Sequence, residues 1–212
     1  MWTPSDRVVG AVTALGGLLA IVATVPTRWY GPRPTDSYVF DPPRFSALWV
    51  ERTVVPVLAV AAALLILTGL LWVFRRDRAR MARWQRWFAV VCVIGAAVGT
   101  LSTMLFASVG GRALADPTAA LNALLGVGLA LLALLLLFPG LLAWGAGYLR
   151  SGRQRLGAAL VGGPVVAVAV VAASIALDFG ADSVGALPVV VPVGVAVVVV
   201  GYDLWAREDA GV

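Results

Sequence analysis

Six long, largely apolar runs constrain this chain more than any other feature of its sequence. Each run has about the 20 residues that a helix needs to cross the ~30 Å hydrocarbon layer of a bilayer. Only 13% of the 212 residues are charged, which is too few to cover a soluble fold of this length with a polar shell. The sequence therefore predicts an all-α integral membrane protein, a bundle of six transmembrane helices in a single domain over residues 1–212. The predicted spans are 8–26, 54–74, 88–108, 119–138 with an apolar extension to 149, 156–177 and 184–203.

Glycine and proline interrupt the last two runs, at Gly162-Gly163-Pro164, Pro188 and Pro192. These residues disfavour a helix in water. In lipid, however, every backbone polar group must be bonded within the protein, so a helix is still the expected structure.

The fourth run is too long for one straight span. Residues 119–149 would form a helix of about 46 Å at 1.5 Å per residue. Pro139 removes a backbone donor and Gly140 adds conformational freedom. We therefore expect a kink or break near 138–140. Residues 141–149 would then follow the membrane interface, anchored by Trp144 and Tyr148.

Arginine is concentrated between the second and third runs. Residues 75–87 carry a net charge of +5, equal to that of the whole chain, because one acid, Asp77, faces six arginines. The connection 150–155 adds three more arginines and no acid. Short arginine-rich connections remain in the cytoplasm. We therefore expect a multi-pass protein of the cell membrane with both termini cytoplasmic (N-in/C-in). The predicted cytoplasmic basic loop contains Arg75, Arg76, Arg78, Arg80, Arg83 and Arg86.

This basic loop favours contact with anionic lipid headgroups rather than nucleic acid. Trp84 and Trp87 lie beside the arginines, and indole rings settle at the headgroup level of a membrane. No nucleic-acid-reading module accompanies the charge, so no nucleic-acid partner is predicted.

The connection 27–53 is predicted to be a long external loop. Within it, Asp41 followed by Pro42 has the pattern of a helix start, and it predicts an interfacial helix over 42–51. A lid or a partner-binding surface is the alternative interpretation of this loop.

The third run has one face of small and hydroxyl-bearing residues. At about 100° per residue this face contains Cys92, Gly95, Gly99, Ser102 and Thr103. Gly95 and Gly99 are four residues apart, a spacing that allows two helices to approach closely in lipid. The face is predicted to be either a helix-packing seam or the wall of a narrow polar path.

The sequence carries no recognisable catalytic, cofactor or metal site. It has no histidine, and its single cysteine, Cys92, lies within an apolar run. We therefore predict a non-catalytic membrane component without cofactors, which packs with another membrane protein or with a second copy of the chain. The alternative is a small transporter or channel-like protein with a path along the third span. A water-accessible cavity that reaches mid-membrane and is lined by the hydroxyl groups of that span would favour the alternative. A dry core with an exposed apolar or basic patch would favour the first prediction.

Overall fold

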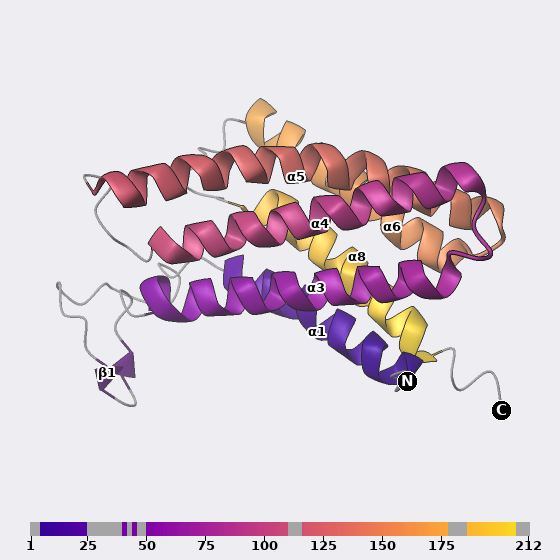
Figure 1. The fold of residues 1–212 in the computed structure, drawn as a ribbon, viewed down its shortest axis with the longest axis horizontal. Coiled ribbons are helices and arrows are strands. Elements are labelled where there is room, and N and C mark those ends of the chain that lie inside the picture. The colour runs from indigo at the N-terminus through magenta and orange to yellow at the C-terminus, as the bar shows by residue number, and fades with distance from the viewer. Residues whose placement is uncertain are drawn as a thin grey trace.

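The computed structural model describes residues 5–24, 40–41, 44–45, 50–109, 116–177 and 186–206. Within these ranges six helices are long and apolar enough to cross a membrane (Figure 1). The predicted six-helix architecture is confirmed. The helices are α1 (Asp6–Thr24), α3 (Val55–Asp77), α4 (Arg83–Val109), α5 (Pro117–Arg150), α6 (Gln154–Ala176) and α8 (Leu187–Ala206).

The interfacial helix predicted over 42–51 is wrong wherever the described residues test it. Strand β1 (Phe40–Asp41) pairs antiparallel with β2 (Arg44–Phe45), and the π-helical turn η2 (Val50–Val54) leads directly into α3. Residues 42–43 and 46–49 lie outside the described part of the chain. A proline disfavours the α-conformation in the residue before it, so the Pro42-Pro43 pair argues against a helix starting there.

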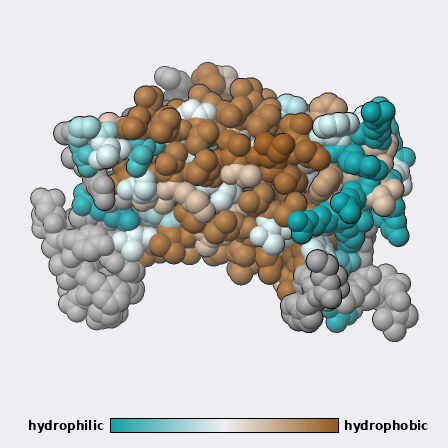
Figure 2. All heavy atoms as spheres, viewed as in Figure 1, coloured by the Kyte–Doolittle hydropathy of each residue, from teal (hydrophilic) through white to brown (hydrophobic). Residues whose placement is uncertain are grey.

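The six helices form a closed ring. Each packs against its neighbours in the order α1, α3, α4, α5, α6 and α8, and α8 returns to α1. The start of α1, the end of α8, the α3–α4 turn and the α5–α6 turn all lie at one end of the ring (Figure 1). We call this the basic end, because Arg75, Arg78, Arg80, Arg83 and Arg86 are exposed there. Figure 2 shows a broad apolar band between this end and the opposite one.

Glycine pairs close the ring between α1 and α8. A Cβ atom added to Gly10 would lie 2.6 Å from the carbonyl oxygen of Gly201, and one added to Gly17 would lie 2.6 Å from that of Gly194. The two glycines are seven residues apart in each helix, so the pairs recur after two turns. Lipid provides no hydrophobic drive for helix association, and such close backbone contact supplies the van der Waals attraction instead.

We predicted a kink or a break near 138–140, and the break is wrong, because α5 is one continuous helix of 34 residues. The last third of α5 packs against the neighbouring helices of the ring and does not follow the membrane interface. A Cβ atom on Gly140 would lie 2.8 Å from the Cβ of Cys92, and one on Gly147 would meet the side chain of Gln85. Trp144 and Tyr148 are 0% and 3% exposed, so they are core residues and not interfacial anchors. Contacts with α4 on one side and with α6 at Gly145 on the other stabilise this part of the helix despite the hydrogen bond lost at Pro139.

The glycine pairs between α1 and α8 lead to a stability prediction. Gly201→Ala should lower the free energy of unfolding by about 1–3 kcal/mol, because its Cβ would lie 2.5 Å from the backbone nitrogen of Ala14 and push α1 and α8 apart. Gly128→Ala is the matched control, since nothing lies within 4 Å of a Cβ there. Thermal unfolding in a mild detergent measures both. Equal melting temperatures for the two variants would contradict the claim that close glycine contacts between α1 and α8 stabilise the ring.

Candidate functional site

A cavity of about 530 Å³ lies inside the ring and is lined by all six helices. It begins some turns in from the basic end and extends toward the opposite ends of the helices. The lining residues nearest the basic end are Thr13, Leu70, Leu141, Leu160 and Val200. Those toward the opposite end include Ala20, Ala63, Phe106, Ala130 and Val189.

The structure divides the predicted face of the third span into two parts. Gly99, Ser102 and Thr103 line the cavity. Cys92 and Gly95 instead pack against α5: Cys92 is fully buried, and a Cβ on Gly95 would lie 2.9 Å from that of Leu136. A helix-packing stretch and a stretch of cavity wall therefore follow one another along α4.

The hydroxyl groups around the cavity already donate to backbone carbonyls. Ser102 Oγ donates across to Gly126 on α5 at 2.7 Å, and Thr100 Oγ1 reaches Ala63 on α3 at 3.5 Å. The threonines also donate to carbonyls of their own helices. These intrahelical bonds are Thr13 to Val9 at 2.7 Å, Thr100 to Ala96 at 2.9 Å and Thr103 to Gly99 at 2.9 Å. An ion or strongly polar solute would lose its hydration here with little replacement, so the cavity suits an apolar guest.

The size of the cavity falls within the range of known ligand-binding pockets. Apolar cavities of roughly 150 Å³ stay dry and bind small hydrocarbons, and ligand pockets span roughly 300–1,000 Å³. The volume and the lining both fit a lipophilic molecule.

Large apolar side chains fill the ring between the cavity and the basic end. Val73, Trp144, Leu156 and Leu204 are each at most 1% exposed. They belong to the main hydrophobic core, which also contains Leu70, Leu141, Leu160 and Val200 of the cavity wall. We call Val73, Trp144, Leu156 and Leu204 the plug.

A buried polar cluster lies at the basic end, on the side of the plug away from the cavity. Asp77, at 2% exposure, accepts hydrogen bonds from Tyr148 Oη at 2.8 Å, Arg153 Nη1 at 2.6 Å and Arg76 Nε at 3.2 Å. Arg76 also forms a 2.6 Å ion pair with Asp6. These residues, together with Trp72, whose indole donates to Asp6 at 3.2 Å, form the Asp77 cluster.

Sequence reasoning missed this cluster. The sequence places Asp77 and Arg76 in the basic loop but indicates no partner for either of them on another helix. One signal was available: Asp77 is the sole acid among the arginines of 75–87. Its partner Tyr148 is 71 residues away, and the two meet only because α4 packs against both α3 and α5.

The remaining arginines of the predicted loop stay on the surface. They form the arginine rim, which we define as Arg75, Arg78, Arg80, Arg83 and Arg86. Trp84 and Trp87 beside them are 39% and 65% exposed. The guanidinium of Arg150 lies 5.6 Å from the centre of the Trp84 ring. The rim thus combines exposed cations with exposed indoles.

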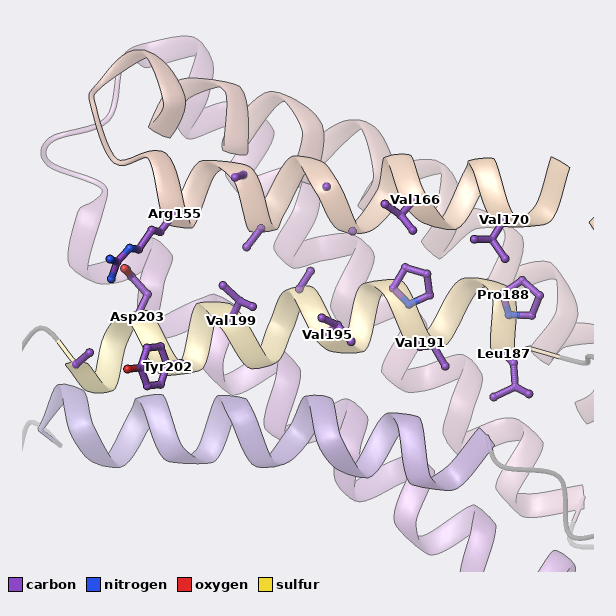
Figure 3. Close-up of a pocket in the computed structure, with 17 residues that line it drawn as sticks. Arg155, Val166, Val170, Leu187, Pro188, Val191, Val195, Val199, Tyr202 and Asp203 are labelled. Atoms are coloured by element: carbon purple, nitrogen blue, oxygen red, sulfur yellow. The ribbon is translucent and has the colours of Figure 1, made fainter. Parts of the chain in front are cut away.

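A groove of about 1040 Å³ runs between α6 and α8 on the outer surface of the ring (Figure 3). Val166 and Val195 along it are 48% and 51% exposed. Arg155 and Asp203 lie at its end near the basic end, and Leu187 and Pro188 lie at the other (Figure 3). In a bilayer this groove would face lipid directly, unlike the cavity within the ring.

Comparison with known proteins adds no family assignment. No protein-family model, curated protein or solved structure matches this chain. Among the described residues, no group of three or more acidic or cysteine side chains is placed to hold a metal ion.

The Asp77 cluster leads to a second stability prediction. Asp77→Asn removes the charge that Arg76 and Arg153 share, and it should lower the free energy of unfolding by about 3 kcal/mol. Tyr148→Phe removes one donor to a buried carboxylate and should cost about 1–2 kcal/mol. Arg83→Gln, an exposed change at the same end, should stay within about 0.5 kcal/mol of the parent protein. Chemical unfolding in detergent ranks the three variants, and any other order would contradict the role given to Asp77.

Proposed function

We propose that this chain is a non-catalytic, multi-pass protein of the cell membrane that binds a lipophilic molecule inside its ring of six helices. The observation that carries the proposal is the apolar cavity to which every span contributes. The proposal favours a cavity along the third span over a purely packing role, but with an apolar guest instead of a polar solute. The hydroxyl groups of the cavity wall donate their hydrogen bonds to backbone carbonyl groups. The alkyl and phenyl side chains of the wall therefore provide the surface that contacts the guest.

The proposed orientation places the basic end, and with it both termini, in the cytoplasm. The arginine rim supports this orientation through the excess of positive charge at cytoplasmic connections. Exposed arginines beside Trp84 and Trp87 also support binding of anionic lipid headgroups at this end. The groove between α6 and α8 provides a surface for another membrane protein or a second copy of the chain, as a further candidate interaction.

Photo-crosslinking tests the cavity. A fatty acid with a mid-chain diazirine should form adducts on cavity-lining residues such as Ile66 and Val193 when the protein is reconstituted in vesicles. Gly99→Phe places a ring in the cavity, since a Cβ there is only in ordinary contact with Ala133 at 3.4 Å. The adducts should then fall about tenfold, which corresponds to about 1.4 kcal/mol in binding. Mass spectrometry of the digested protein locates them.

Leu101→Phe is the matched control, two residues away on the same helix and 51% exposed toward lipid. It should leave the cavity adducts unchanged. Adducts on lipid-exposed residues such as Leu135 provide an internal reference in every sample. Cavity adducts that are absent, or that respond equally to both phenylalanine substitutions, would contradict the proposal.

Cysteine labelling tests the orientation. In a Cys92→Ala background, a cysteine replacing the exposed Ser151 of the α5–α6 turn should resist a membrane-impermeant thiol reagent in intact cells. It should react once the cells are opened. Rapid labelling of Ser151→Cys in intact cells would place the basic end outside and reverse the proposed topology.

A further inference from the structure

We infer that the Asp77 cluster and the plug together form a gate, which closes the lipophilic cavity toward the basic end and opens when the cluster separates. This inference rests on the proposed function, because it takes the cavity as the binding site. It assigns to the cluster the control of access to that site, in addition to its contribution to stability.

Three layers follow one another along the inner faces of the helices. On α3, Leu70 lines the cavity, Val73 belongs to the plug and Asp77 centres the cluster. On α5 the same order recurs in Leu141, Trp144 and Tyr148. Both series advance by three and then four residues, the spacing that keeps side chains on one helix face. The cluster therefore lies directly over the plug, and the plug lies over the cavity.

The cluster joins elements that would have to separate for the cavity to open at this end. Asp77 at the end of α3 contacts Tyr148 on α5 and Arg153 just before α6. Through Arg76 the same network reaches Asp6 at the start of α1. Four of the six helices of the ring are thus linked by charged and hydrogen-bonded side chains at the level where a guest would pass.

The chemistry of the cluster suits a contact that opens. Buried ion pairs hold a structure less firmly than well-packed apolar groups, because the charges lose hydration, and their best-attested uses include switching. The side chains of Arg76, Arg153 and Asp6 are 23%, 24% and 32% exposed, whereas that of Asp77 is 2% exposed. Water at the basic end therefore reaches the two arginine partners of the carboxylate and can replace their contacts one by one.

A cysteine reporter within the plug tests the gate. Val73→Cys in a Cys92→Ala background changes side-chain volume little, and position 73 is 1% exposed. A charged methanethiosulfonate reagent is added to vesicles on the side of the basic end only. Labelling at position 73 should be slow in the parent protein and about tenfold faster with Asp77→Asn. Tyr148→Phe should give a smaller increase, and Arg83→Gln should give none.

A second reporter separates gating from general loosening of the bundle. Ala119→Cys lies near the start of α5, far from the basic end, and position 119 is 2% exposed. With Asp77→Asn it should stay unlabelled from the basic side. If labelling at positions 73 and 119 rises together, Asp77 has only a structural role and the gate is overturned.

The remaining outcomes are also decisive. Rapid labelling of Val73→Cys in the parent protein, or equal rates with and without Asp77→Asn, overturns the gate. If Asp77→Asn does not accumulate in membranes, Tyr148→Phe decides by the same criteria.

Diazirine adducts in the cavity are measured on the same samples. Their presence with an unchanged labelling rate refutes the gate alone, whereas their absence from the parent protein refutes the binding function.

Discussion

Close backbone contact at glycine is the interaction on which the rest of this structure depends. In lipid, apolar side chains gain nothing by leaving the hydrocarbon, so helices associate where small residues allow their backbones to meet. Gly10 and Gly17 meet Gly201 and Gly194 across the α1–α8 interface, which joins the first helix to the last. Without that contact the six helices would form an open row, and no interior would exist to bind anything.

Closing the ring produces an interior that differs along its length. Near the basic end, Trp144 and the other large side chains of the plug fill the space. Farther along, many of the inward-facing residues are alanine, glycine, serine or threonine, and these small side chains do not fill the space, so a cavity remains. The polar cluster lies at the filled end, where Asp77 can receive three donors while its arginine partners still reach water. The proposed binding and gating functions both follow from this asymmetry between a filled and a hollow half.

Part of the candidate site was readable in the sequence. The small face of the third span could be drawn from helical periodicity, and Gly99, Ser102 and Thr103 from that face line the cavity. Periodicity gives the direction of a side chain around its own helix but not what lies opposite. It could not separate the stretch that packs on α5 from the stretch that borders the cavity. For the same reason Trp144 and Tyr148 of α5 were predicted to be interfacial, although packing against the other helices buries them.

The sequence alone determined that six apolar helices would form, because in lipid the backbone must satisfy its hydrogen bonds within each span. It also determined the concentration of arginine in one connection. Only the tertiary structure decided that the ring closes, that α5 continues through Pro139, and that Asp77 is buried with Tyr148 and Arg153. These features depend on contacts between residues tens of positions apart, and such contacts follow from three-dimensional packing rather than from any local pattern.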